Sequence, residues 1–201
     1  MKRILTIISL PLLFMSCDAL IETRELDLKA VLRVSPELPY QTSETDGDFV
    51  ETRVITASDV RDDLEDLEIN SVKEVNISSI SVSINSISDN EAQFVALNAF
   101  YEDDNTARTA VFSDYVVDLA SFEGSALVPV TGYELSGINL LSDKLFDILQ
   151  ENDLGSFTLI LEGNSTDANG NQSGEAIFLV IDAEIEAEAI FTEELEVPSF
   201  P

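Results

Sequence analysis

Apolar and polar residues alternate along most of the chain after about residue 25, and this pattern predicts strands. In residues 26–34 five apolar side chains share one parity while Asp27, Lys29 and Arg33 share the other, which is typical of a strand with one buried face. Similar alternation, or a short apolar run bounded by turn residues, recurs along the chain. The predicted strands are residues 26–34, 49–56, 72–84, 93–101, 108–117, 127–133, 157–162 and 175–191.

Two of these strands have special features in their patterns. The apolar parity changes within residues 75–82, which predicts a β-bulge near Ser78 and Ser79. Residues 176–181 are apolar on both faces and should cross the centre of a sheet. Acidic and apolar residues alternate strictly over 182–189, which favours a strand although Ala and Glu are good helix formers.

Two short helices and one loop interrupt the strands. Ser58 and Ser142 each precede apolar residues at helical spacing, so each can cap the start of a short helix. Gly155 is the expected terminator of the second helix. Residues 35–47 contain two prolines and an Asp-Gly pair, which predicts a loop. The apolar helix positions are Val60, Leu64 and Leu67 in the first helix and Leu145, Phe146, Ile148 and Leu149 in the second.

About eight strands, two short helices and polar turns predict a mainly β protein whose two antiparallel sheets pack as a β-sandwich. A closed β-barrel is the alternative arrangement of the same strands. Residues 127–133 contain Pro129 and therefore fit only an edge strand. Because the chain has no internal repeat and no second domain, residues 26–201 are expected to form one sandwich domain.

The first seventeen residues follow a different pattern. Lys2 and Arg3 precede an apolar run over residues 4–15, which is shorter than the roughly 20 residues that a membrane-spanning helix needs. A charged start followed by about 7–15 apolar residues is typical of a secretory signal peptide. The run ends in Leu13-Phe14-Met15-Ser16-Cys17, with a small residue directly before the cysteine.

This ending resembles a lipobox, the motif of bacterial lipoprotein precursors that signal peptidase II reads, and its form is similar to those of Bacteroidota lipoproteins. The resemblance implies cleavage between Ser16 and Cys17 and attachment of lipid, including acyl chains such as palmitate, to the Cys17 thiol. Residues 1–16 are then the signal peptide, and residues 17–25 hold the lipidated cysteine and a short tether. The alternatives are a free thiol after a plain signal peptide and the N-terminal helix of a cytosolic protein.

The charge of the chain limits its partners. Ten basic and 39 acidic residues give a net charge of −29, and removal of residues 1–16 takes away two basic residues and makes it −31. Such a charge repels nucleic acid and anionic lipid headgroups, so nucleic acid is not expected as a partner. An acidic surface can bind divalent cations or a basic partner, or it can keep an exported protein hydrated in a salty environment. The even spread of the acidic residues favours the second explanation.

The inventory of reactive side chains argues against an enzyme. Cys17 is the only cysteine, so there is no intrachain disulfide and no cysteine-based zinc site. The chain has no histidine, which excludes the common nucleophile–base pairs and histidine–metal catalysis. A hydrolase that uses two carboxylates stays compatible with 39 acidic residues. The absence of tryptophan nevertheless argues against the aromatic platforms of sugar-processing sites, and the sequence predicts a non-catalytic protein.

The polar loop 164–175 is the strongest candidate for a ligand site, here a calcium ion. Four side chains with oxygen ligands stand there at alternating positions, as they do in calcium loops. Gln172 occupies the position where an EF-hand loop needs its turn glycine. The alternative is a hairpin loop built on the Asn-Gly pair. The candidate ligands are Asp167, Asn169, Asn171 and Glu175.

A row of acidic residues in the last strand, here called the acidic row, is a second candidate. Side chains two residues apart on one face of a strand lie about 7 Å apart, so neighbouring carboxylates can share a cation or face a basic partner. The alternative is a solvated sheet face whose charges discourage edge pairing. The acidic loops 44–48 and 102–105 are weaker candidates for the same two interpretations, a site for a cation or basic partner and a solvated surface. The acidic row consists of Asp182, Glu184, Glu186 and Glu188.

Three functions fit these features. The favoured one is a lipid-anchored, non-catalytic module of the cell envelope that binds or assembles with another protein near the membrane. The second is a carrier of an apolar ligand or lipid, because a sandwich or barrel rich in Ile, Leu and Phe can enclose one. The third is a calcium-dependent surface module. Lipid on Cys17 would hold the protein at a membrane, with the outer membrane or cell surface favoured and the periplasmic side as the alternative.

Overall fold

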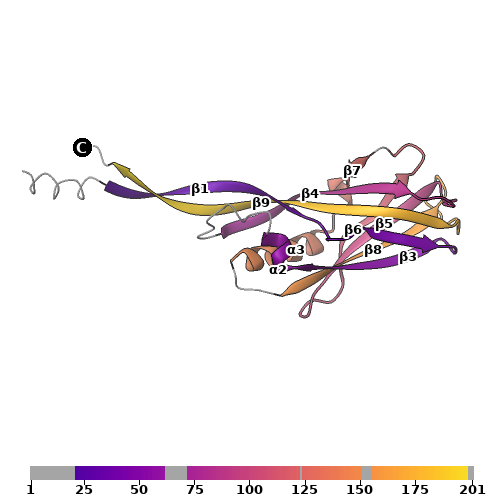
Figure 1. Ribbon diagram of the computed structural model, residues 1–201, viewed down its shortest axis with the longest axis horizontal. Helices are drawn as coiled ribbons and strands as arrows, with labels where there is room; N and C mark the ends of the chain where they lie inside the picture. Colours follow the sequence, from indigo (N-terminus) through magenta and orange to yellow (C-terminus); the bar gives the residue numbers. More distant parts are fainter. Residues whose placement is uncertain (1–20, 62–71, 123, 151–154, 199–201) are drawn as a thin grey trace, which may run out of the picture.

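The computed structural model describes residues 21–61, 72–122, 124–150 and 155–198, which form two antiparallel sheets packed face to face (Figure 1). These two sheets remain separate over the described residues, so the protein is the expected β-sandwich and not a closed barrel. Sheet A contains β1 (Ile21–Val34), β2 (Tyr40–Glu44), β4 (Val72–Ser86), β7 (Ser125–Leu127) and β9 (Ile177–Pro198). Sheet B contains β3 (Asp48–Thr56), β5 (Phe94–Glu102), β6 (Thr109–Asp118) and β8 (Ser156–Thr166).

β9 is the central strand of sheet A. It pairs with β4 along one side and with β1 and then β2 along the other. Ile177, Leu179 and Ile181 are fully buried at the start of β9, as expected for a segment that is apolar on both faces. The register between β4 and β9 shifts between Ile77 and Ser79, which confirms the predicted bulge.

The outer ends of β1 and β9 form a two-stranded ribbon that leaves the sandwich (Figure 1). Leu28 pairs with Phe191, and β4 begins opposite Phe191. Among the described strands, the segments beyond this point therefore pair only with each other. At about 3.3 Å per residue, Ile21–Asp27 carries β1 about 23 Å beyond the sandwich. The strand thus begins inside the segment predicted to be a tether, because β9 supplies backbone partners as far as Pro198.

Two helices close the end of the sandwich from which the ribbon leaves. α3 (Leu135–Leu149) packs against β4 of sheet A and β6 of sheet B and buries Leu141, Leu145 and Ile148. α2 (Ala57–Arg61) contacts α3 and buries Val60, and the 3-10 turn η3 (Val130–Gly132) precedes α3. One cluster of buried side chains joins both sheets and both α-helices, so the described residues share a single core.

The segment predicted as loop 35–47 contains a strand, β2. Tyr40 and Thr42 are buried and alternate with exposed residues. The two prolines and the Asp-Gly pair on either side of these five residues indicate a loop, so the sequence does not show the strand. β2 forms because β9, which is distant in sequence, offers it a partner, and local propensity does not reveal such a contact.

The segment between β6 and β8 also differs from the prediction. Of the expected strand 127–133 only Leu127 belongs to a strand, β7, and Tyr133 forms an isolated bridge with Phe112 of β6. The 3-10 turn η3 follows Pro129 and lies between them. The helix expected from Ser142 begins seven residues earlier. Gly137 is a poor helix former, so the sequence pattern does not reveal this start. A Cβ atom at position 137 would lie 1.9 Å from the carbonyl oxygen of Ala110. Glycine therefore allows α3 to approach β6 closely.

The first helix is capped by Thr56 and not by Ser58. The backbone N–H of Thr56 donates to Asp59 Oδ2 at 2.7 Å, and the N–H of Asp59 is 3.4 Å from Thr56 Oγ1. These reciprocal bonds form a capping box, which satisfies backbone donors at the start of α2. The predicted helix positions Leu64 and Leu67 lie outside the described residues.

Candidate functional site

The acidic row lies on the outer face of sheet A, along its central strand. Its members are exposed or half-buried, whereas Ile185, Ala187 and Ala189 between and beside them are buried. The alternation therefore belongs to a strand with one solvated face, as predicted. Glu186 and Glu188 have paired strands on both sides, so their charges do not protect a sheet edge, and that part of the alternative is wrong for them. Asp182 and Glu184 pair with β4 on one side and lie between the end of β1 and the start of β2 on the other.

Basic residues of β1 face part of the acidic row. Lys29 Nζ lies 2.6 Å from Glu188 Oε1, and Arg33 Nε lies 3.6 Å from Glu186 Oε2 and 4.0 Å from Glu184 Oε1. These side chains are largely solvated, so each ion pair contributes at most about 1 kcal/mol. Within the described ranges, Asp182 at the end of the row forms no ion pair.

A groove with a volume of about 410 Å³ lies beside this end of the acidic row. Residues 182–184 of β9 form its floor. One side is formed within residues 35–40, which comprise the connection from β1 to β2 and the first residue of β2. On the other side Ser81, Ser83 and Ser125 bring hydroxyl groups from β4 and β7. The groove therefore combines two carboxylates, three hydroxyls and an apolar wall that contains leucine and proline.

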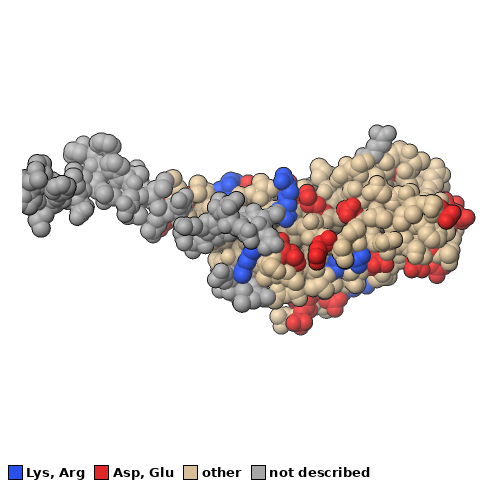
Figure 2. Space-filling model, viewed as in Figure 1, with Lys and Arg blue, Asp and Glu red and all other residues tan. Residues whose placement is uncertain are grey.

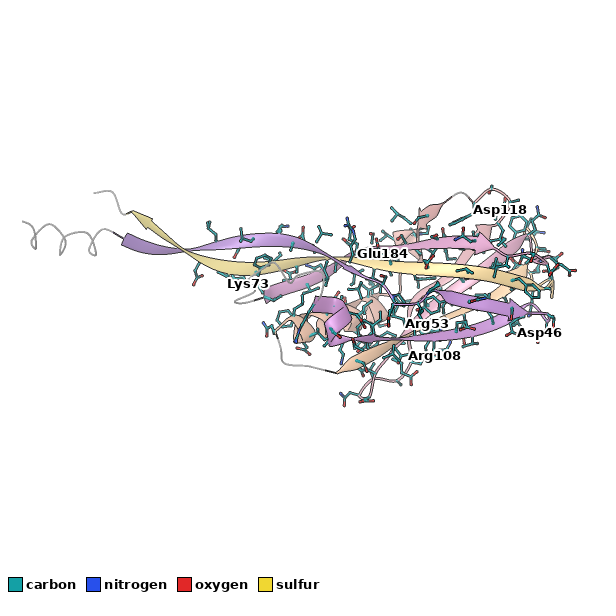
Figure 3. All side chains as sticks on the ribbon, in the orientation of Figure 1. Asp46, Arg53, Lys73, Arg108, Asp118 and Glu184 are labelled. Atoms are coloured by element: carbon teal, nitrogen blue, oxygen red, sulfur yellow. The ribbon has the colours of Figure 1, made fainter. Side chains whose placement is uncertain are left out.

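Arg53 of sheet B fixes the apolar wall in place (Figure 3). Its Nη2 donates to the carbonyl oxygen of Pro39 at 2.6 Å, and its Nε donates to that of Leu38 at 3.2 Å. The guanidinium also lies 5.1 Å from the centre of the Tyr40 ring. Burial raises the pKa of Tyr40, although the Arg53 charge opposes this, so the phenol stays neutral at physiological pH.

The loops at the end of the sandwich opposite the ribbon are acidic throughout. The β2–β3, β4–β5, β6–β7 and β8–β9 connections contain no Lys or Arg. Figure 2 shows acidic side chains without basic ones at this end, where Figure 3 labels Asp46 and Asp118. Asp48 accepts a hydrogen bond of 2.7 Å from Gln172 Nε2, which ties two of these loops together.

The predicted calcium loop at this end is a hydrogen-bonded turn. Asp167 Oδ1 accepts the backbone N–H groups of Asn169 at 2.8 Å and Asn171 at 2.9 Å, and Gly170 has a φ of 80°. The hydrogen bonds from Asn171, followed by that from Asn169, hold the pKa of Asp167 below its usual value. Glu175 instead accepts a serine hydroxyl at 3.3 Å. These bonds match the hairpin alternative, and calcium binding stays a prediction.

The loop after β5, the other acidic candidate, ties a hairpin to α3. Asp103 accepts hydrogen bonds from the Tyr101 hydroxyl at 2.5 Å and from the backbone N–H groups of Asn105 and Thr106. Lys144 Nζ lies 3.9 Å away, and both charged side chains are at least nine-tenths buried. Burial raises the pKa of Asp103, but the hydrogen bonds lower this pKa by more than burial raises it. The pKa of Asp103 therefore lies below its usual value.

Sheet B has an apolar outer face that sequence reasoning missed. Val50, Val54 and Val116 are exposed on it. Ile160 and Ala96 also point outward, because the residues before and after each of them belong to the core cluster. Both side chains are nevertheless buried, although neither is part of that cluster. The apolar residues at consecutive positions of β8 could have indicated this face, because a strand with only one buried face would alternate apolar and polar residues.

The remaining predicted site residues, Ser16 and Cys17, lie outside the described residues. β1 begins four residues after Cys17, at the free end of the ribbon. The helices within the described ranges are all too short or too polar to span a membrane. In the same ranges, no three carboxylate or thiol side chains converge as ligands for a metal ion.

Comparison with solved structures yields distant structural neighbours. No model of a protein family matches the chain, and no curated protein does. Desmodium yellow mottle tymovirus has a TM-score of 0.31 and 6% identity over 88% of this chain and 93% of its own. The empty head of turnip yellow mosaic virus gives 0.32 and 11% over 86% and 83%, and the decameric BFDV capsid protein gives 0.28 and 13% over 84% and 99%. At these TM-scores the likeness supports no inference about function.

Proposed function

We propose that this protein is a lipid-anchored, non-catalytic module of the cell envelope that binds or assembles with another protein. The ribbon carries this proposal, because it links the sandwich to the end of the chain that holds the lipobox cysteine. Lipid on Cys17 would hold the free end of the ribbon at the outer membrane or cell surface. The sandwich would then stand away from the membrane with its outer faces accessible to a partner.

The packing between the sheets supports protein binding over carriage of an apolar ligand. A carrier needs a cavity lined mainly by apolar side chains. Here the side chains of both sheets and of α3 form one continuous buried cluster. Among the described residues, hollows of about 350, 410 and 460 Å³ open at the surface, and their linings mix serines and charged residues with apolar and aromatic side chains. Binding is therefore expected at an outer face of the sandwich.

Lipid attachment is tested by a pair of single substitutions next to the cleavage point. In a bacterial host that processes lipoproteins, the wild-type chain should incorporate labelled palmitate and lose its first sixteen residues, as measured by intact mass. Cys17→Ala should abolish the label and leave residues 1–16 attached. Ser16→Ala keeps a small residue before the cysteine and should behave as the wild type. Palmitate retained on Cys17→Ala would contradict the proposed anchor.

Partner binding is tested by crosslinking the full-length protein in intact cells. The proposal expects reproducible adducts larger than the monomer, with the same partner recovered by mass spectrometry in independent experiments. Cells that carry Cys17→Ala should give fewer of these adducts, because the protein is no longer held near its partner. Recovery of the monomer alone, at several crosslinker lengths, would contradict a binding or assembly function.

A further inference from the structure

We propose that the groove beside Asp182 and Glu184 binds an extended, positively charged polypeptide segment of a partner protein. This assignment rests on the proposed function and adds the location of binding and the chemistry of the partner. The groove lies on the outer face of sheet A, between residues 35–40 and the serines of β4 and β7. Its volume of about 410 Å³ falls within the usual range of binding pockets.

The floor of the groove carries negative charge that the protein neutralises only in part. Asp182 and Glu184 occupy neighbouring positions on one strand face, about 7 Å apart. No basic residue is among the described residues that line the groove. Arg33 lies nearer to Glu186, at 3.6 Å, than to Glu184, at 4.0 Å. A lysine or arginine that enters the groove would therefore complement an unmatched charge.

Exposed leucines flank this acidic floor. Leu38, in the wall of the groove, and Leu127, on β7, are each 65% exposed. Leu127 pairs with Ser81 in the sheet, so its side chain lies on the same outer face as the groove. The apolar stem of a lysine or arginine can pack against such leucines while its charged end reaches a carboxylate. A segment in which basic and apolar residues alternate fits both features.

The walls of the groove are held in place before a partner arrives. Arg53 bonds to the backbone of the apolar wall, and the opposite wall belongs to paired strands of sheet A. Ser81, Ser83 and Ser125 present hydroxyl groups that can donate to or accept from an extended backbone. A preformed site loses less conformational entropy on binding, which favours affinity.

Binding is measured with the mature lipidated protein, residues 17–201, in detergent and a fluorescent peptide of nine alternating lysine and valine residues. The double variant Asp182→Asn/Glu184→Gln should bind this peptide about tenfold more weakly, because two charge pairs are lost. Glu186→Gln/Glu188→Gln removes the same charge from the same row outside the groove and should change the affinity less than twofold. Equal losses in both variants, or no binding to the wild type, would overturn the proposal.

The site is located in cells with a photo-crosslinking amino acid in place of Ser125, in the groove, or of Val50, on the outer face of sheet B. We expect an adduct through Ser125 that maps to a lysine- or arginine-containing segment of the partner. An adduct only through Val50, or one through Ser125 to a segment without basic residues, would overturn the groove assignment and leave the proposed function standing. The absence of adducts at both positions would contradict both.

Discussion

The two sheets of this protein share one core but differ in the chemistry of their outer faces. Sheet A exposes serines, the acidic row and ion pairs between β1 and β9. Sheet B exposes Val50, Val54 and Val116 and nearly buries Ile160 on the same face. Solvated ion pairs contribute little to stability, whereas buried apolar side chains contribute substantially. The outer face of sheet A can therefore serve binding, because the fold depends on it only weakly.

Arg108 links the charged and apolar parts of the outer face of sheet B. Its guanidinium lies 3.9 Å from the centre of the Phe100 ring, and its Nη2 lies 2.5 Å from Glu162 Oε2. Phe100 is the register partner of Ile160, so this arrangement covers the centre of the face. A cation over an aromatic ring contributes about 0.5–2 kcal/mol, depending on how far it is desolvated. Outward-pointing side chains thus stabilise sheet B.

The two outer faces should differ most in how much the free energy of unfolding changes when an outward-pointing residue of each is replaced by alanine. Ile160→Ala should lower the free energy of unfolding by about 3 kcal/mol, because it removes an apolar side chain that is only 6% exposed together with its packing contacts. Ser81→Ala, at an outward position of sheet A, should change it by less than about 0.5 kcal/mol. Urea unfolding of both variants measures the two values. Similar values would mean that the outer face of sheet B does not stabilise the fold.

The sequence revealed the elements whose side-chain pattern is local. The bulge of β4 was predictable because it changes the parity of the apolar residues, and the one-sided strand over 182–189 was predictable because acidic and apolar residues alternate there strictly. β2 was not predictable, since its five residues form a strand only against β9. The start of α3 was concealed by Gly137, which is needed for a contact with β6 that the sequence does not display.

The candidate site was predictable only in part, because local side-chain patterns do not reveal contacts between distant segments. Asp182 and Glu184 were recognised from their alternation, but the groove beside them joins segments from four strands and a loop that are distant in sequence. Leu38 belongs to the segment predicted only as a loop, and Arg53 bonds to it from the opposite sheet. Such a site depends on the tertiary fold, whereas the acidic row depends on strand parity alone.

A second, intermediate effect concerns the buried charge below the β5–β6 hairpin of sheet B. Asp103→Asn should cost about 2 kcal/mol at pH 7, because it weakens charged hydrogen bonds and removes a buried negative charge 3.9 Å from Lys144 Nζ. The folded pKa of Asp103 is lowered, so its contribution is present above the unfolded pKa of about 3.9 and is lost as the pH falls through the folded pKa. The cost should therefore be smaller at pH 2 than at pH 7.

Urea unfolding at the two pH values tests this difference. Glu186→Gln serves as the control from sheet A, because it removes a carboxylate whose ion pair with Arg33 is largely solvated. It should change the free energy of unfolding by less than about 0.5 kcal/mol at pH 7. An Asp103→Asn cost that is the same at pH 2 and pH 7 would show that the lost contribution is not electrostatic.

The smallest expected difference separates two arginines that each pair with glutamate. Arg108→Gln should destabilise the protein by about 1 kcal/mol, because it removes a contact with the Phe100 ring as well as an ion pair with Glu162. Arg33→Gln should cost less than about 0.5 kcal/mol, because its side chain is largely solvated. At 1 M NaCl the Debye length falls to about 3 Å, so the Arg33 effect should nearly vanish while most of the Arg108 effect remains. Urea unfolding at low and high salt measures both, and an Arg108 effect that disappears in salt would mean that the ring contact contributes nothing to sheet B.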